Sequence, residues 1–354
     1  MLPGTLARLS GGTIYDRQIV DGLRRSRWQV GLLELRGDFP WPDPAALEDA
    51  AQQVARLPDG ACVVADGLAF GAMPAIAQQH GKRLRWIALV HHPLALETGL
   101  RTAQQQTLFA SERAALATAR GVIVTSARTA AALADYGVAP AQLHVVVPGT
   151  APAPLATGSA QADGACALLC VASLTPRKGH RVLLEALAEL QDRNWTLHCV
   201  GDTRRDAATT EALQARIAAL GLTQRVLLHG ELDLAGLQAM YRQADLFVLP
   251  SYYEGYGMAL AEALACGLPV VSSTGGAIAD TVPADAGVLV PPGDSDALRA
   301  ALALLLDEPH RRAELRAGAR RARARLHDWP VAVGQFAAAL DAIDRGAAMA
   351  SAAP

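Results

Sequence analysis

The residues best suited to chemistry lie in one segment, Pro250–Val271, with the sequence PSYYEGYGMALAEALACGLPVV. It holds two carboxylates, Glu254 and Glu262, eight positions apart. At a helical rise of about 1.5 Å per residue, the eight positions between these carboxylates correspond to roughly 12 Å. That separation suits the span from a sugar ring to a ribose across a diphosphate, and each carboxylate can accept two hydroxyl hydrogen bonds.

The turn inside this segment has the layout of a phosphate site. An apolar strand is expected over Leu246–Leu249, and a helix over Met258–Cys266, where Gly267 ends it. Gly255 and Gly257 let the backbone approach a ligand closely, and the helix start presents free N–H groups and the positive end of the helix dipole. The alternative is that the two glutamates are only a loop charge and a surface helix residue.

A second candidate is the segment Cys170–Gly179, CVASLTPRKG, which begins in a predicted strand. The chain has only two lysines, Lys82 and Lys178, among its 32 lysines and arginines. In so arginine-biased a chain, a lysine beside Gly179 indicates a site that needs a compact ammonium group rather than a guanidinium fork. The alternative is a solvated loop lysine.

The third candidate is a histidine pair at the end of the predicted strand Trp86–Val90, which runs into His91-His92-Pro93. Side chains at strand ends of an α/β sheet line the crevice where ligands bind. Neighbouring strand residues point to opposite sides, so His91 and His92 should not both face a ligand or share one metal ion. A purely structural role remains the alternative for each.

The segment with the two glutamates resembles the Glu-x7-Glu region of retaining glycosyltransferases of family 4, which have the GT-B fold, and the resemblance covers nearly the whole chain. It implies that Glu254 contacts hydroxyls of the donor sugar and that Glu262 contacts the ribose. It also implies that the amides of Gly255, Tyr256 and Gly257 face the sugar and the phosphates.

The same resemblance suggests roles for the other candidates. Lys178 matches the family's lysine on the donor diphosphate, whereas Ser173 stands where the family has an arginine, so Arg177 is the candidate for the second charge. Strand register in family members favours His91 as the residue that reaches the donor sugar or the acceptor. Gly12 lies in a glycine pair similar to the family's turn under the donor phosphate, and a plain tight turn is the alternative.

Short apolar runs alternate with helical patterns along the chain and predict the elements that position these residues. The runs are Ala61–Ala65, Trp86–Val90, Gly121–Thr125, His144–Val147, Leu168–Ala172, Thr196–Val200, Val226–His229, Leu246–Leu249 and Pro269–Ser272. Most are four to six residues long without polar alternation, which is typical of strands covered on both faces. Their alternation with helices predicts α/β domains with doubly wound parallel sheets.

A segment without periodicity, PGTAPAPLATGSAQADG, divides the chain. We therefore predict an N-terminal, acceptor-side Rossmann-like domain over 1–148, a linker over 149–164, a donor domain over 165–328 and a helix over 329–345 that returns to the first domain. In the GT-B fold the two domains face each other. Only Met1-Leu2 precede Pro3-Gly4, so either the first strand is very short or the natural start lies upstream.

Composition restricts the class of protein. Hydrophobic residues make up 51% and the net charge is −2, which favours a globular protein and disfavours nucleic acid as a partner. There is no apolar run of 18 residues and no signal sequence, so we expect a soluble, cytoplasmic protein. The basic stretch Arg311–Arg325 is expected to be a solvated helix face, with peripheral membrane contact as the alternative. Five cysteines are expected to be reduced core residues: Cys62, Cys166, Cys170, Cys199 and Cys266.

The resemblance implies a hexosyltransferase-type enzyme that moves a sugar from a nucleoside diphosphate to a hydroxyl acceptor with retained configuration. His91, Glu254 and Lys178 are its expected catalytic residues, and no cofactor or metal ion is expected. The acceptor is a glycan, a lipid carrier or a small molecule. A catalytically impaired nucleotide-sugar-binding relative, or an epimerase or phosphorylase of the same fold, remains open. The glycine spacing argues against a dehydrogenase.

Overall fold

The computed structural model describes residues 1–7, 10–159 and 164–351. The chain divides into two compact units. The first comprises Met1–Gly149 and His327–Pro354, and the second comprises Thr150–Leu326. Each unit has its own hydrophobic core, with Phe70 and Trp86 among the largest buried side chains of the first unit and Trp195 and Phe247 among those of the second. Residues 160–163 of the expected linker lie outside the described part of the chain.

The first unit is built on parallel strands. These are β1 (Leu2–Pro3), β2 (Glu34–Leu35), β3 (Cys62–Asp66), β4 (Arg85–Val90), β5 (Gly121–Val124) and β6 (Leu143–Val145). Strands β3 to β6 form a four-stranded sheet in chain order, and β1 pairs with β2. The backbone of Met1 joins the two pieces, because its amino group donates to Val64 O at 2.8 Å and its carbonyl accepts from Asp66 N at 2.9 Å.

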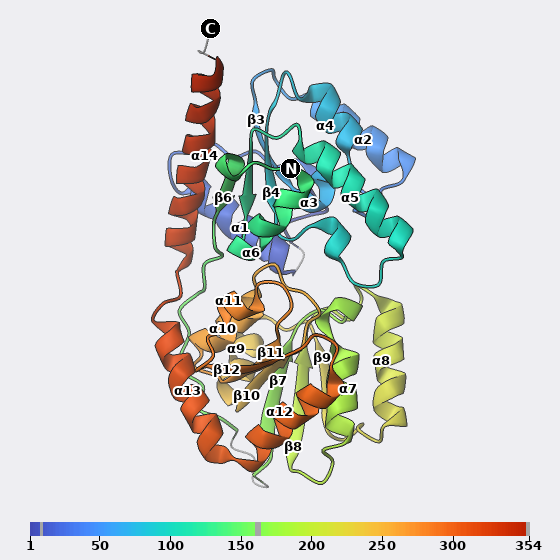
Figure 1. Cartoon of the computed structure of the whole chain (residues 1–354), viewed down its shortest axis with the longest axis vertical. Coiled ribbons are helices and arrows are strands. Elements are labelled where there is room, and N and C mark those ends of the chain that lie inside the picture. The colour runs from blue at the N-terminus through green and yellow to red at the C-terminus, as the bar shows by residue number, and fades with distance from the viewer. Residues whose placement is uncertain (8–9, 160–163, 352–354) are drawn as a thin grey trace. The chain divides into compact units, whose positions relative to one another are not determined.

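Helices surround these strands (Figure 1). They are α1 (Gly11–Arg24), α2 (Pro44–Ala55), α3 (Gly67–Phe70), α4 (Pro74–His80), α5 (Thr102–Leu116), α6 (Ala127–Ala132) and α14 (Trp329–Ser351), with 3-10 turns η1 (Leu94–Leu96), η2 (Leu133–Tyr136) and η3 (Pro140–Gln142). The C-terminal helix α14 packs against α1, where Gly22 leaves room for Val333. The chain thus returns to the first unit.

The second unit holds one six-stranded parallel sheet in the order β12-β11-β10-β7-β8-β9. Its strands are β7 (Cys166–Val171), β8 (Trp195–Val200), β9 (Val226–Gly230), β10 (Leu246–Leu249), β11 (Val270–Ser273) and β12 (Gly287–Val290). Its helices are α7 (His180–Ala188), α8 (Ala207–Ala219), α9 (Leu234–Gln243), α10 (Met258–Ala265), α11 (Ile278–Thr281), α12 (Ser295–Asp307) and α13 (Pro309–Arg323), with the 3-10 turn η4 (Pro176–Lys178).

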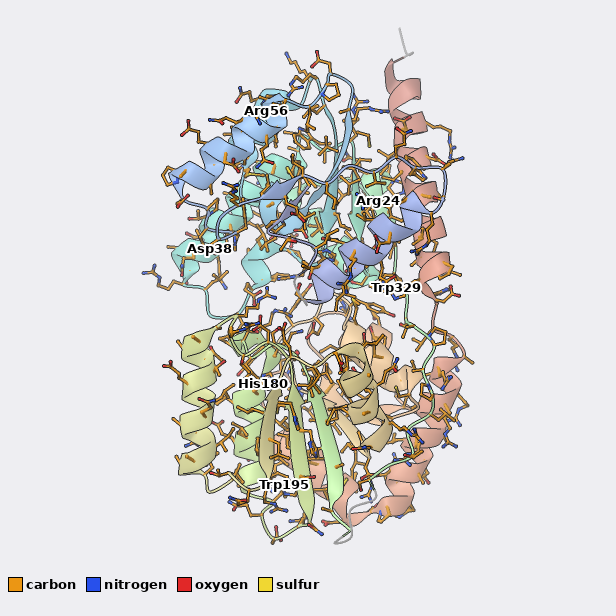
Figure 2. All side chains as sticks on the ribbon, turned by 180° about the vertical axis from the view of Figure 1, so that it is seen from behind. Arg24, Asp38, Arg56, His180, Trp195 and Trp329 are labelled. Carbon is orange, nitrogen blue, oxygen red and sulfur yellow. The ribbon has the colours of Figure 1, made fainter. Side chains whose placement is uncertain are left out.

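This strand order fixes which end of the second sheet can bind a ligand. If the six strands are numbered 1 to 6 in chain order, their order across the sheet is 3-2-1-4-5-6. The direction in which successive strands are added therefore reverses between β7 and β10. Right-handed crossovers then place the helices of the two halves on opposite faces and leave a crevice beyond the carboxyl ends of these two strands. Figure 2 shows His180 and Trp195 at opposite ends of this unit, and His180 marks the carboxyl end because it follows β7.

All nine strands named from the apolar runs are present, and Leu246–Leu249 has the expected bounds. Two expectations are wrong. Gly11 and Gly12 are not a turn before the first helix but its first two residues, because the Ser10 hydroxyl accepts from Thr13 N at 3.2 Å and caps the helix there. Cys62 is exposed rather than buried, since it begins β3, while the other four cysteines are buried and all five are free.

No helix in the described part of the chain combines the length and apolar character that a membrane span requires.

Candidate functional site

The strands on either side of the reversal in the second sheet each lead into a loop with candidate residues. The loop after β7 carries Lys178, and the loop after β10 carries Glu254. Their side chains meet: Lys178 Nζ lies 2.6 Å from Glu254 Oε1. Two sequence signals that are 76 positions apart therefore form one site at the carboxyl end of the sheet.

Further donors surround the Glu254 carboxylate. The Ser251 hydroxyl donates to Oε1 at 2.6 Å, and Arg177 Nη1 lies 3.4 Å from Oε2. The same Arg177 nitrogen donates to Tyr253 O at 2.6 Å, which ties the two loops together. Glu254 is 6% exposed, so this carboxylate is held in a nearly solvent-free setting by two cations and a hydroxyl.

The electrostatics keep Glu254 ionised. Burial alone would raise the pKa of its carboxyl group, but the charges of Lys178 and Arg177 and the hydrogen bonds from Lys178 and Ser251 outweigh burial and lower it to about 2. Within these three side chains two cations face one carboxylate, so positive charge exceeds negative charge by one among them. An anionic ligand is the natural partner of such a cluster.

The Glu254 loop enters α10 through Gly257, which adopts φ +91 and precedes the helix. The Leu260 N–H donates to Gly257 O at 2.9 Å, so the N–H groups that precede it at the start of α10 are the ones suited to an anion. Glu262 lies within α10, and its Oε2 accepts from the Tyr241 hydroxyl at 2.9 Å. Burial raises the pKa of Glu262, while the hydrogen bond from Tyr241 opposes that effect.

Gly275 and Gly276 support the loop from β11. Gly276 pairs with Glu254 as an isolated bridge, and Ala277 N donates to Glu254 O at 2.8 Å. A Cβ on Gly275 would lie 2.2 Å from Tyr252 O, so the backbone approaches closely there. The backbone position of Glu254 is therefore fixed on this side as well as through Arg177.

Gly179 is needed to bring Lys178 to the Glu254 loop. It has φ +72, and an added Cβ would lie 2.1 Å from Pro250 O. Gly221 is a matched control, since it has φ +70 but open space around the added Cβ. Both alanine variants should lose about 1–2 kcal/mol of unfolding free energy from the left-handed backbone. We expect Gly179→Ala to lose clearly more in urea denaturation, and equal losses would contradict the close approach.

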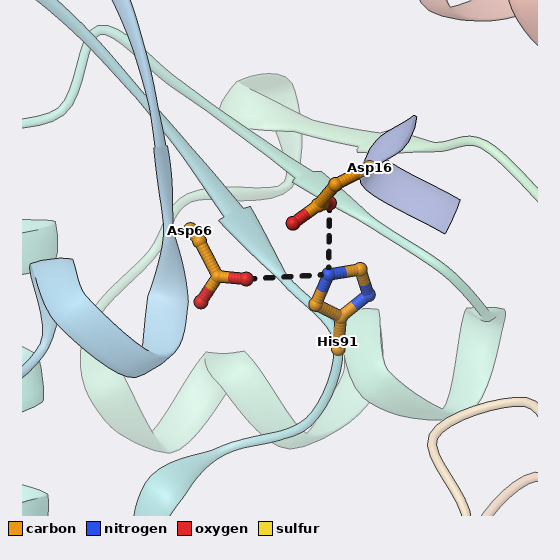
Figure 3. Close-up of side chains that lie close together, drawn as sticks. All are labelled: Asp16, Asp66 and His91. Atoms are coloured by element: carbon orange, nitrogen blue, oxygen red, sulfur yellow. Dashed lines mark hydrogen bonds and ion pairs between the residues drawn. The ribbon is translucent and has the colours of Figure 1, made fainter. Parts of the chain in front are cut away.

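The first unit holds a second cluster, drawn in Figure 3. His91 follows β4, Asp66 ends β3, and Asp16 lies on α1. His91 Nε2 is 3.3 Å from Asp16 Oδ1 and 3.6 Å from Asp66 Oδ2. These three residues could also hold a metal ion, because their ligand atoms all lie within 4.8 Å of one another.

The charges in this cluster depend on one another. Burial would lower the pKa of His91, but hydrogen bonds and charge from Asp16 and Asp66 outweigh it and raise the pKa to about 10. Burial raises the pKa of Asp16, and the charge of Asp66 and a hydrogen bond with it act in the same direction, while the hydrogen bond and charge of His91 oppose them. For Asp66 the opposing hydrogen bond and charge of His91 exceed the effect of burial, so its pKa is lowered.

Two further sequence candidates, Gly12 and His92, lie in the first unit. Gly12 is beside His91, because an added Cβ would lie 3.4 Å from the imidazole ring. His92 does not join the cluster and instead pairs with Glu97 at 3.3 Å. The Asp-x-Asp triplet at 294–296 lies at the start of α12, where Asp294 caps the helix by accepting from Ala297 N at 2.9 Å.

Sequence reasoning missed Asp16, Asp66, Ser251 and Tyr241. Asp66 carried a usable signal, since it directly follows the apolar run Ala61–Ala65, as His91 follows its own strand. Asp16 and Tyr241 lie inside helical patterns, where their contacts depend on tertiary packing.

Two family models match the chain and together cover most of it. The description "Glycosyltransferase Family 4" matches residues 9–153, and "Glycosyl transferases group 1" matches residues 159–322. The boundary between the two matches falls within the segment that the sequence predicts as a linker.

Curated relatives align over part of their length. The MMP alpha-(1->4)-mannosyltransferase of Mycolicibacterium hassiacum is 30% identical over 74% of this chain and 66% of its own. The D-inositol 3-phosphate glycosyltransferase of Thermobispora bispora is 36% identical over 60% of this chain and 53% of its own. The chain thus spans about half to two thirds of the length of these relatives.

Solved structures match over nearly the full chain. Sucrose-phosphate synthase from Thermosynechococcus elongatus has a TM-score of 0.83 at 24% identity and covers 98% of both chains. Anabaena HepE in complex with UDP and glucose has a TM-score of 0.75 at 18% identity, with 96% of this chain and 98% of its own covered. At these identities the likeness shows the fold alone, which is the GT-B fold with its two Rossmann-like α/β domains.

Proposed function

Because this chain belongs to the glycosyltransferases that the family 4 and group 1 models describe, we propose that it transfers a sugar from a nucleoside diphosphate to a hydroxyl acceptor with retained configuration. In this proposal the second unit, with the linker ending at 164, is the donor domain. The first unit, with the helix over 329–345, supplies the acceptor side.

The observation that carries the proposal is the cluster of Glu254 with Lys178 and Arg177 beyond β7 and β10. Its excess positive charge suits a diphosphate, and the nearby start of α10 offers N–H groups to the same anion. The Glu254 carboxylate is suited to accept hydrogen bonds from sugar hydroxyls. We assign Gly255, Tyr256 and Gly257 to the same donor site, with Gly12 on the first unit.

In the reaction the bond between the anomeric carbon and the diphosphate oxygen breaks, and a new bond forms to the acceptor oxygen on the same face of the sugar. The acceptor proton passes to the departing phosphate oxygen, so nucleoside diphosphate and glycoside are the products. Lys178 and Arg177 stabilise the charge that develops on the diphosphate, without a metal ion at that position.

Glu254 is assigned to holding the sugar rather than to attacking it. Its carboxylate already accepts from Lys178 and Ser251 at 2.6 Å each. A carboxylate with a pKa of about 2 and two paired cations is a weak nucleophile. Positioning of the donor and stabilisation of developing charge are therefore the contributions we assign to the enzyme.

Glu262 is assigned to the ribose hydroxyls. Its Oε2 already accepts from Tyr241, which fixes the carboxylate on α10 and leaves Oε1 for a ligand hydroxyl. The eight-residue spacing from Glu254 places the two carboxylates at opposite ends of the donor molecule in this assignment.

The relatives suggest the first substrates to test. One is a mannosyltransferase and another a glycosyltransferase acting on D-inositol 3-phosphate. We would therefore incubate the protein with nucleoside-diphosphate mannose and glucose donors and with sugar, polyol-phosphate and lipid-linked acceptors. Proton NMR of the product reports its anomeric configuration.

Formation of a glycoside with the donor's anomeric configuration supports the proposal. An epimerised nucleotide sugar would indicate an epimerase, and a sugar phosphate formed from a glycan and phosphate would indicate a phosphorylase. Nucleotide binding without any of these products would indicate a catalytically impaired relative.

A further inference from the structure

The cluster in the first unit brings three groups together from three separate elements. Asp16 comes from α1, Asp66 caps the short helix α3 after β3, and His91 follows β4. Figure 3 shows both carboxylates directed at the same imidazole nitrogen. Asp16 and Asp66 are 7% and 8% exposed, so their charges are largely removed from water.

With both carboxylates ionised, hydrogen-bond accounting places a proton on His91 Nε2. Ionised carboxylates only accept, so the nitrogen that contacts both carboxylates must carry a hydrogen. Asp66 has one further donor, since its Oδ1 accepts from Leu68 N at 2.7 Å. Asp16 Oδ2 is buried and has no donor in the described part of the chain. Nε2–H of His91 is thus the central donor of the cluster.

Nδ1 lies on the side of the ring away from both carboxylates (Figure 3). Among the described residues, the hydrogen bonds and ion pairs of the His91 ring all involve Nε2. The side chain is 20% exposed, so a ligand can reach it. The edge-on ring of Tyr15, 5.3 Å between centroids, packs against the imidazole, and an added Cβ on Gly12 would lie 3.4 Å from the same ring.

The charge balance favours a protonated ring. Two buried carboxylates with one neutral imidazole would leave two negative charges without a close counter-charge, which is costly in a low-dielectric setting. Among the described residues, the α-amino group of Met1 also interacts with Asp16 and Asp66, and burial lowers its pKa. A second proton on His91 supplies the missing positive charge between the carboxylates. The raised pKa of His91 agrees with this balance.

We propose that Asp16 and Asp66 are positioning residues that hold His91 as an imidazolium, with Nε2–H shared between the two carboxylates and Nδ1–H presented to the substrate. This proposal rests on the proposed function, because the substrate that His91 contacts is the donor sugar or the acceptor. In this state His91 donates a hydrogen bond and a positive charge to a substrate oxygen, and it does not act as a general base near neutral pH.

The protonation state can be measured without a substrate. In protein labelled with 15N-histidine, long-range proton–nitrogen correlation reports the charge of each ring, and His91→Gln identifies the His91 signals. We expect both nitrogens of His91 to carry protons from pH 6 to pH 9. Asp16→Asn and Asp66→Asn should each lower the pKa of His91 by about 1 to 3 pH units. Asp21→Asn, which changes an exposed aspartate on the same helix, should leave it unchanged.

Three results would overturn the proposal. One is a neutral His91 at pH 7.5 in the unchanged protein, and another is a His91 pKa that neither aspartate variant moves. The third is one equivalent of a tightly bound metal ion, detected by elemental analysis and lost in Asp16→Asn, because the cluster would then be a metal centre. If one variant fails to fold, the other still decides the pKa result.

The kinetic consequence separates this proposal from the proposed function. If the protein transfers sugar, kcat of Asp16→Asn should fall while nucleotide affinity stays within about twofold, because the nucleotide is assigned to the second unit. If no donor is used at all, the proposed function fails, yet the NMR result still supports or overturns the imidazolium on its own.

Discussion

Glu254→Gln is expected to lower kcat for sugar transfer by about 100-fold, because a charged hydrogen-bond acceptor for the sugar is replaced by a neutral amide. The same change removes the Glu254 charge from its mostly buried ion pairs with Lys178 and Arg177. Breaking a buried pair in this way costs about 3–5 kcal/mol of unfolding free energy. Steady-state kinetics and urea denaturation measure the two effects.

The stability effect has a defined pH window. The pKa of Glu254 is about 2 in the folded protein, against an ordinary value of 4.5. Its ionised form therefore stabilises the fold fully above pH 4.5, and this contribution is lost as the pH falls toward 2. The difference amounts to about 3 kcal/mol. Glu254→Gln should flatten the pH dependence of the unfolding free energy in this window.

Glu211→Gln is the matched control, since Glu211 is an exposed glutamate on α8 of the same unit. It should leave both kcat and the pH dependence of stability unchanged. Full turnover of Glu254→Gln would contradict the role of Glu254 in holding the sugar. An unchanged stability profile between pH 4.5 and 2 would contradict the ion pair with Lys178.

Lys178→Ala is expected to have the second large effect. Removal of the ammonium group takes away the compact cation assigned to the diphosphate, so kcat should fall by about 100- to 1,000-fold. Nucleoside-diphosphate affinity should fall by about tenfold or more, since a charge-assisted contact is lost. Product formation in quenched reactions measures the loss of kcat, and isothermal titration calorimetry measures the loss of nucleotide affinity.

The chain offers a matched control in its only other lysine, Lys82, which is exposed and belongs to the first unit. Lys82→Ala should behave like the unchanged protein in both measurements. Lys178→Arg should recover only part of the lost activity, because a planar guanidinium does not reproduce a compact ammonium. Equal nucleotide affinity in the Lys178→Ala and Lys82→Ala variants would show that Lys178 does not contact the diphosphate.

The strands, and the two candidate residues Lys178 and Glu254, could be predicted from the sequence for a physical reason. Parallel strands covered on both faces appear as continuous apolar runs, and the loops after two such runs hold Lys178 and Glu254. The strand order was not readable, because period and length do not say which strands are neighbours. Only the order shows that these two loops flank the reversal of the sheet.

The cluster around His91 shows where sequence reasoning ends. His91 follows its strand and was found from that position. Asp16 lies in a helix whose pattern shows only an amphipathic surface, and its contact with His91 depends on how α1 packs. The start of α1 was also misplaced, because the cap by Ser10 includes Gly11 and Gly12 in the helix.

The central claim is that the second unit binds a nucleoside-diphosphate sugar through Lys178 and Glu254. The most direct test is the melting temperature of the protein with UDP, GDP, ADP and dTDP, each with and without Mg²⁺, beside Lys178→Ala. We predict a rise with one nucleotide that is independent of Mg²⁺ and much smaller in Lys178→Ala, since a ligand at 100 times its dissociation constant stabilises the fold by about 2.7 kcal/mol. No rise with any nucleotide, or an equal rise in Lys178→Ala, would contradict the claim.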